Sequence, residues 1–143
     1  MNSELGYVRV LTVSPRLRVA DVQANVREIL EDVAECDKSG ADIALFPELA
    51  LTGYTCADLF QQETLLQAAL DGLGEIVRAT EDLSSVVVVG LPLRVQGQLF
   101  NCAAVLHRGA TRVAALYFAT LAAIAAVLLH NLYIGGDRGE GMY

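Results

Sequence analysis

Short apolar runs alternate with helical patterns over the first hundred residues. Residues 43–46 form one run that ends at Pro47, and residues 86–91 form a second that ends at Pro92. Such runs, rich in β-branched residues and bounded by proline or glycine, are typical of buried strands. Strands that alternate with helices predict an α/β layered fold with right-handed crossovers. Because the runs are continuously apolar, we expect both faces of the sheet to be buried, either by helices or by a second sheet.

The elements around these two strands have their own boundary signals. Residues 7–13 predict a first strand, and Asp21 is expected to cap a helix whose apolar residues recur at three- and four-residue spacing until Gly40. A second helical pattern covers residues 64–79, although two glycines inside it each cost about 1 kcal/mol relative to alanine. Two apolar segments on either side of Gln96 and Gly97 predict an antiparallel hairpin.

The chain changes character after residue 109. Residues 113–129 are 17 consecutive residues without a charge, rich in Ala and Leu, and a glycine-rich end follows them. This length is just below the roughly 20 residues of a usual membrane span. We therefore expect two parts: residues 1–109 as an α/β part, and residues 110–143 as an unrelated apolar tail with a helix over about residues 113–130 and a flexible end. The tail helix is either buried or membrane-seeking.

Composition narrows the function classes. The 143 residues are 54% hydrophobic, which excludes a disordered chain, and the net charge of −7 argues against a nucleic-acid partner. The three cysteines form no CxxC pair and no residues have the spacing of a metal site, so we expect a reduced, cytoplasmic protein without a metal. The ten basic residues include a single lysine, Lys38.

One segment carries candidate chemistry. Glu48 follows Pro47 directly after a predicted buried strand, at the sheet edge where ligands bind in open α/β sheets. Gly53 lets the backbone turn sharply a few residues later. Packed among Phe46 and Leu49, the Glu48 carboxylate would be partly desolvated, which makes it a stronger base. The alternative is an ordinary solvated glutamate in a loop.

The residues around Glu48 form a recognisable pattern. The runs Phe-Pro-Glu-Leu (46–49) and Leu-Thr-Gly-Tyr (51–54) resemble the carbon–nitrogen hydrolase, or nitrilase, superfamily. The longer run Leu-Thr-Gly-Tyr-Thr-Cys-Ala-Asp-Leu-Phe (51–60) narrows this resemblance. The runs Val-Gly-Leu-Pro (89–92) and Leu-Phe-Asn-Cys-Ala (99–103) add similarity to the amino-terminal glutaminase domain of glutamine-dependent NAD⁺ synthetases. The resemblance covers about residues 5–109.

This resemblance implies a fold and an activity. The fold would be part of a nitrilase-like α-β-β-α sandwich, here followed by the apolar C-terminal helix. The activity would be hydrolysis of the glutamine amide by a Glu–Lys–Cys triad, with glutamate as the general base, lysine on the oxyanion and cysteine as the nucleophile. Ammonia would pass to a separate synthetase domain, which would bind the ATP, so no cofactor is expected in this chain. Glu48 matches the base, and Tyr54 matches an aromatic near the glutamine site.

The sequence departs from the family pattern at the other two triad positions. The lysine is expected in a Pro-Lys motif soon after residue 109, where this sequence has none. Lys38 lies before the strand that Glu48 follows, about 17 Å away at ~3.3 Å per residue. Of the cysteines, Cys36 falls on a predicted helix and Cys102 in a hairpin strand. Cys56 is the nearest to Glu48 in sequence and the only one worth testing as a nucleophile.

Three hypotheses therefore stay open. The chain is a glutaminase part of an NAD⁺ synthetase, a non-catalytic fragment of such a protein, or a nitrilase-like module tethered to a membrane through residues 113–129. Half of a sandwich would expose apolar sheet surface and tend to self-associate.

Overall fold

The computed structural model describes residues 6–115, which form a five-stranded sheet and two long helices. The elements in chain order are β1 (Val10–Thr12), α1 (Val22–Lys38), β2 (Ile43–Leu45), the 3-10 helix η2 (Ala57–Gln61), α2 (Glu63–Ala79), β3 (Val86–Val95), β4 (Gln98–His107) and β5 (Ala110–Ala115). The predicted order of strand, helix, strand, helix, strand and hairpin is thus confirmed.

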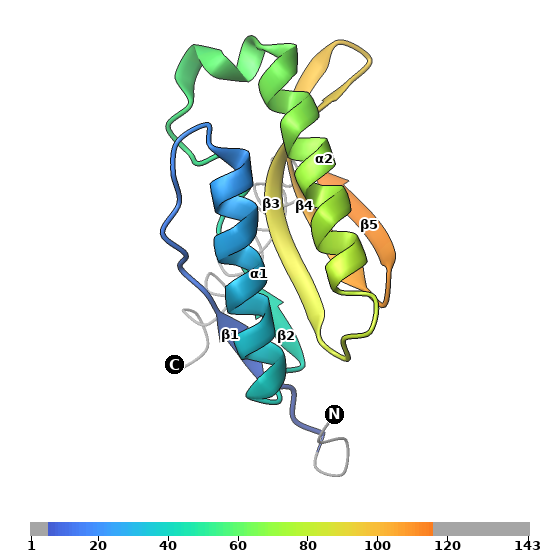
Figure 1. The fold of residues 1–143 in the computed structure, drawn as a ribbon. Helices are drawn as coiled ribbons and strands as arrows, with labels where there is room; N and C mark the ends of the chain where they lie inside the picture. The colour runs from blue at the N-terminus through green and yellow to red at the C-terminus, as the bar shows by residue number, and fades with distance from the viewer. Residues whose placement is uncertain (1–5, 116–143) are drawn as a thin grey trace, which may run out of the picture.

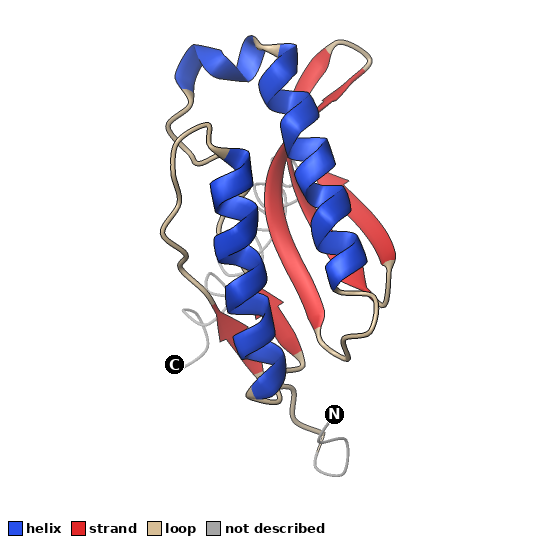
Figure 2. Ribbon diagram, viewed as in Figure 1, coloured by secondary structure: helices blue, strands red, loops and turns tan. Residues whose placement is uncertain are grey.

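The sheet is mixed, and its strands lie in sequence order from β1 to β5. β1, β2 and β3 are parallel neighbours, whereas β3, β4 and β5 are antiparallel. The parallel half requires crossovers, and α1 and α2 supply them on the same face of the sheet (Figures 1 and 2). The described residues therefore provide one helix layer and one sheet of the four layers that the nitrilase resemblance implies.

Local signals place the helix and hairpin ends as expected. The Asp21 side chain accepts a hydrogen bond from the backbone N–H of Ala24 (3.1 Å), so it caps α1 as predicted. Gln96 and Gly97, both with positive φ, form the two-residue turn between β3 and β4. Two positive φ angles are what a type I′ hairpin turn needs, which confirms the predicted hairpin.

The two faces of the sheet are covered unequally. Residues that point toward the helices are fully buried, among them Ala44 in β2, Val87 and Val89 in β3, and Ala104 in β4. On the opposite face the side chains alternate with these, and Val10, Leu45 and Val105 are 48%, 39% and 38% exposed. The prediction that both faces are buried is therefore wrong at these three positions of the opposite face, which we call the open face.

The C-terminal prediction needs a correction. β5 pairs with β4 from residue 110 to residue 115, so residues 113–115 are strand and do not begin a helix. The boundary predicted after residue 109 falls at the β4–β5 turn, and the strand beyond it belongs to the same sheet. The remainder of the predicted helix and the glycine-rich end lie outside the described residues. Neither helix within residues 6–115 has the length and apolar character needed to cross a membrane.

The two glycines of α2 have different surroundings, which gives a test of the helix packing. A Cβ atom on Gly72 would lie 2.8 Å from Val26 Cγ2 and 3.0 Å from Val22 Cγ1, both on α1. A Cβ on Gly74 would meet only the Arg78 side chain, at 3.5 Å.

We therefore expect opposite effects of the two alanine substitutions on the free energy of unfolding, measured by urea titration. Gly74→Ala should raise it by about 0.5–1 kcal/mol through helix propensity. Gly72→Ala should lower it by about 1 kcal/mol, because overpacking against the stiff valines outweighs the same propensity gain. Equal stabilisation by both substitutions would contradict the close approach of α1 and α2.

Candidate functional site

The candidate site begins where the chain leaves β2. The Phe46 N–H still bonds the Val88 carbonyl of β3 (2.9 Å), and the chain then passes through Pro47 and Glu48 into a tight turn. Leu49 has a positive φ of 53° at this turn, and its carbonyl accepts from the N–H groups of Thr52 (3.1 Å) and Gly53 (2.8 Å). This turn holds Glu48 at the carboxyl end of β2, as the sequence predicts.

The turn lies directly on strand β3 at Gly90. A Cβ atom at Gly90 would lie 2.5 Å from Leu49 N, 2.6 Å from Pro47 O and 2.8 Å from Glu48 Cα. The Leu51 N–H also donates to the Gly90 carbonyl (3.2 Å). Glycine at this strand position allows one backbone to approach another closely, and that approach sets the position of the Glu48 Cα atom.

Glu48 contacts a residue that sequence reasoning did not assign to the site. Asn101 Nδ2, from β4, donates a hydrogen bond to Glu48 Oε1. Asn101 pairs with Pro92 of β3, two positions beyond Gly90, so the hairpin register brings it beside the Glu48 turn. The sequence feature that could have pointed to Asn101 is that it is a polar residue inside an apolar hairpin strand, opposite a proline.

The environment of Glu48 differs from the prediction. Its side chain is exposed, although Phe46 and Leu49 on either side of it are buried. Phe46 and Leu49 are directed into the protein, whereas Glu48 lies on the open face. The predicted desolvation of Glu48 is therefore wrong for this structure, and Asn101 is the group that contacts its carboxylate.

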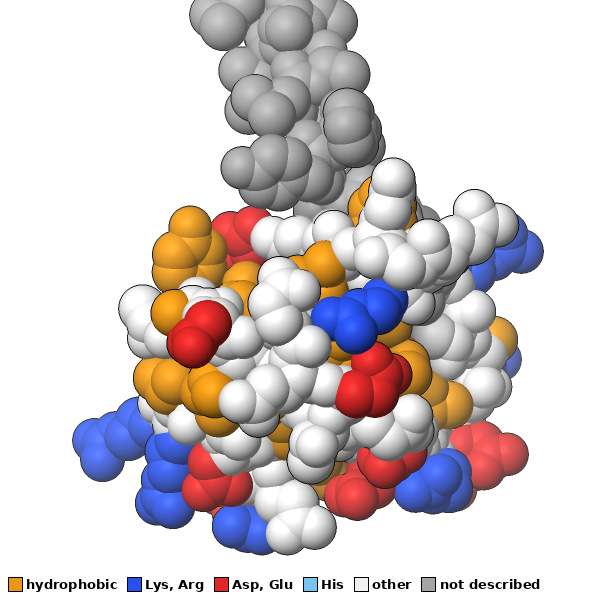
Figure 3. All heavy atoms as spheres, turned by 90° about the horizontal axis from the view of Figure 1, so that it is seen from above, with side chains coloured by type: hydrophobic (Ala, Val, Ile, Leu, Met, Phe, Trp, Pro, Cys, Tyr) orange, Lys and Arg blue, Asp and Glu red, His pale blue; other side chains and the backbone are white. Residues whose placement is uncertain are grey.

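Two hollows adjoin the Glu48–Asn101 pair. One, of about 280 Å³, is lined by Leu45, Phe46, Pro47, Glu48, Val88, Gly90 and Ala103. The other, of about 460 Å³, is lined by Leu49, Phe60, Pro92, Gln98, Leu99, Phe100 and Asn101. Glu48 borders the first hollow and Asn101 the second, so the pair stands between two largely apolar recesses. Figure 3 looks onto the end of the molecule with η2 and the β3–β4 hairpin, where apolar side chains alternate with charged ones.

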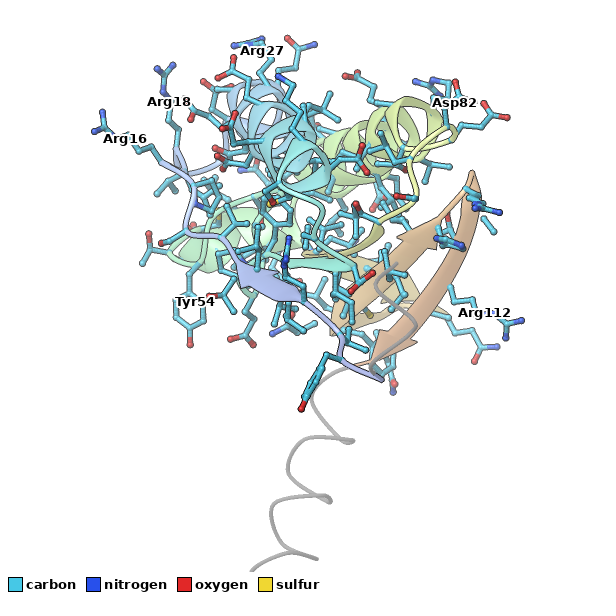
Figure 4. The ribbon with its side chains drawn as sticks, turned by 90° about the horizontal axis from the view of Figure 1, so that it is seen from below. Arg16, Arg18, Arg27, Tyr54, Asp82 and Arg112 are labelled. Carbon is cyan, nitrogen blue, oxygen red and sulfur yellow. The ribbon has the colours of Figure 1, made fainter. Side chains whose placement is uncertain are left out.

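Tyr54 lies apart from these recesses. Its side chain is 69% exposed, it lines neither hollow, and in Figure 4 it projects outward from the molecule. The structure therefore does not bring Tyr54 and Glu48 to a common surface recess, and a substrate-binding role for Tyr54 remains a prediction.

The three thiols are all inside the protein. Burial raises the pKa of Cys36, with Asp32 and Glu35 raising it further, and burial also raises the pKa of Cys102. Cys56 is 1% exposed, and its Sγ atom lies 3.1 Å from the Thr52 carbonyl oxygen as a hydrogen-bond donor. A buried thiol makes a poor nucleophile because substrate cannot reach it.

Lys38 is equally remote from the site. It is the last residue of α1, which leads into the beginning of β2, whereas Glu48 follows the end of β2. In the part of the chain that the structure describes, no three His, Cys, Asp or Glu side chains are grouped so that they could hold a metal ion.

Comparison with known proteins shows which family this chain resembles. The family described as carbon–nitrogen hydrolase matches residues 8–117. A glutamine-dependent NAD(+) synthetase of Mycobacterium tuberculosis is 41% identical over 105 residues, which are 73% of this chain and 16% of the relative. A protein of the same name from Aquifex aeolicus is 37% identical over 91 residues, or 64% of this chain and 16% of the relative. The chain thus spans about one sixth of the length of these relatives.

Solved structures share the fold. The crystal structure of a glutamine-dependent NAD(+) synthetase from Cytophaga hutchinsonii superposes with a TM-score of 0.71 at 28% identity, over 76% of this chain and 18% of that one. An amidase from Nesterenkonia sp. superposes with a TM-score of 0.62 at 23% identity, over 73% of this chain and 40% of that one, and shows the likeness of fold alone.

The close approach at Gly90 generates a prediction about the site. The φ angle of Gly90 is not positive, so alanine fits the local backbone, and any effect of Gly90→Ala comes from the contacts with residues 47–49. We expect the substitution to lower the free energy of unfolding by about 3 kcal/mol or more, because backbone atoms cannot move aside as a side chain can.

Hydrogen exchange reports the local effect. The Leu51 amide, bonded to the Gly90 carbonyl, should exchange faster in Gly90→Ala than in the parent chain. Gly74→Ala serves as the matched control, in which the Leu51 amide should exchange no faster than in the parent chain. Parent-like stability of Gly90→Ala would show that the Glu48 turn does not rest on β3.

Proposed function

The chain belongs to the carbon–nitrogen hydrolase family, and we propose that it supplies the base-bearing part of a domain that hydrolyses the side-chain amide of glutamine for NAD⁺ synthesis. The observation that carries this proposal is the position of Glu48, held at the carboxyl end of β2 and hydrogen-bonded to Asn101. Support for the substrate class comes from the 41% identity to a glutamine-dependent NAD(+) synthetase over 105 residues.

The proposed chemistry assigns Glu48 the role of general base. An exposed carboxylate on the open face can take a proton from a nucleophile and return it to the leaving ammonia. The nucleophile and the oxyanion-stabilising cation would have to meet Glu48 on this face. We propose that the ammonia passes to a synthetase domain, where ATP would bind, and that this chain itself holds no cofactor.

A second candidate function is a non-catalytic module of the same family. The observation that favours it is that all three cysteines are buried and that Lys38, the single lysine, lies at the far end of β2 from Glu48. A chain with this arrangement would keep the fold of the family without its hydrolytic step.

Assay of the purified chain separates these two candidates. Because no accessible thiol faces Glu48 among residues 6–115, we expect no steady release of ammonia from glutamine by the 143-residue chain. The measurement is ammonia production with millimolar glutamine, coupled to a dehydrogenase. Steady turnover that disappears in Glu48→Gln would contradict the expectation and assign complete catalysis to this chain.

A chimera tests the proposed role of Glu48 directly. The matched 105 residues of this chain would replace their counterpart in the Mycobacterium tuberculosis relative. We expect the chimera to form NAD⁺ with glutamine as the nitrogen source, and Glu48→Gln to reduce that rate by about 10²–10⁴, the usual contribution of a general base.

Two controls make the chimera decisive. The rate with free ammonia should be the same in the chimera and in its Glu48→Gln variant, because ammonia bypasses the amide hydrolysis. Glu75→Gln, which changes an exposed glutamate of α2, should leave both rates unchanged. Equal glutamine-dependent rates with and without Glu48→Gln would refute the proposed role.

A further inference from the structure

Asn101 is bonded at one end of its amide group and unpaired at the other. Its Nδ2 atom donates to Glu48 Oε1. Its Oδ1 atom is buried and accepts no hydrogen bond from any residue that the structure describes. A buried acceptor without a partner costs stability, so its presence calls for an explanation outside the fold.

The orientation of the amide follows from the chemistry of its partner. An ionised carboxylate only accepts hydrogen bonds, so the nitrogen end of Asn101 has to face Glu48. Rotating the amide by half a turn would direct Oδ1 at the carboxylate oxygen, where two acceptors repel each other. The unpaired state of Oδ1 is therefore the consequence of bonding Glu48.

A structural asparagine in the same chain behaves differently. Asn25 is fully buried, and its Oδ1 accepts from the Arg18 N–H (2.7 Å) while its Nδ2 donates to the Arg18 carbonyl (2.8 Å) and the Leu51 carbonyl (3.1 Å). Both ends of that amide serve the fold. Asn101 serves the fold at neither end, since its single bond goes to an exposed side chain.

We propose that Asn101 is a positioning residue, whose amide N–H on β4 holds the Glu48 carboxylate in one orientation over the open face. The proposal rests on the proposed role of Glu48 as the base. An exposed glutamate at the exit of a strand would otherwise populate several rotamers, and a base is effective only when it is held near the proton that it removes. A positioning bond of this kind explains why a buried oxygen is left unpaired.

The proposal predicts that removing the Asn101 amide does not lower the stability of the fold but lets the Glu48 side chain rotate freely. Asn101→Leu keeps the branched shape of the side chain, removes the unpaired oxygen and removes the donor. We expect its thermal unfolding midpoint to equal or exceed that of the parent chain. We expect Asn25→Leu, the matched control, to lower the midpoint clearly, because it leaves the Arg18 N–H and the Arg18 and Leu51 carbonyls without their partner.

Nuclear magnetic resonance of the full chain measures whether the Glu48 side chain is held in one orientation. In the parent, the two Glu48 γ-protons should have distinct chemical shifts, and in Asn101→Leu they should converge toward one averaged value as the side chain rotates freely. Conversely, Glu48→Ala should move the Asn101 side-chain ¹H–¹⁵N signals toward free-amide values and leave those of Asn25 unchanged. Because Glu48 is exposed, we expect Glu48→Ala to fold like the parent chain, and it gives a second, independent test of the same hydrogen bond.

Each outcome decides the proposal. A lowered midpoint or loss of folding in Asn101→Leu would make Asn101 structural and overturn it, and so would unchanged Glu48 signals in that variant or unchanged Asn101 signals in Glu48→Ala. These spectra need no turnover, so they are independent of the chimera. An inactive chimera with the expected spectra refutes the proposed function alone, and an active chimera without them refutes only the role of Asn101.

Discussion

The contact between residues 47–49 and Gly90 is the constraint on which the rest of the site depends. A side chain on β3 at this point would occupy the space of Leu49 N, Pro47 O and Glu48 Cα, all within 2.8 Å of a Cβ position. With glycine there, the chain can leave β2, cross the open face of β3 and bond back to it through Leu51. The location of the candidate base is thus set by backbone packing, before any side-chain chemistry.

The two faces of the sheet carry different groups. One face carries the buried core, and the other carries the candidate site. The face under α1 and α2 holds the buried strand residues and the thiol of Cys102. The open face holds Glu48 and Asn101, together with the exposed side chains of Leu45 and Val105. Since successive residues of a strand point to opposite faces, the adjacent residues Asn101 and Cys102 belong to different environments. A cysteine next to the site in sequence is therefore placed away from it in space.

Sequence reasoning succeeded where the signal was local. The Asp21 cap, the Gln96–Gly97 turn and the position of Glu48 after β2 each depend on a few neighbouring residues. It failed for Asn101, whose bond joins residues 53 positions apart and depends on the register of the hairpin. It also failed for residues 113–115, because short runs of Val and Ala fit a strand or a helix equally until the pairing with β4 decides between them.

Family membership and chemical competence are separate properties of this chain. The matched residues include the whole path that positions Glu48, from β2 through Gly90 to Asn101. They do not bring an accessible thiol or a lysine to that carboxylate, because the three cysteines are buried and Lys38 lies beyond the opposite end of β2. Changes at a few positions can add or remove an activity while the fold stays the same, so the function of a protein depends on the residues of its site and not on its fold. In this chain the Glu48 carboxylate, hydrogen-bonded to Asn101, lies on an open sheet face, and the proposed hydrolytic step depends on the groups that would meet it there.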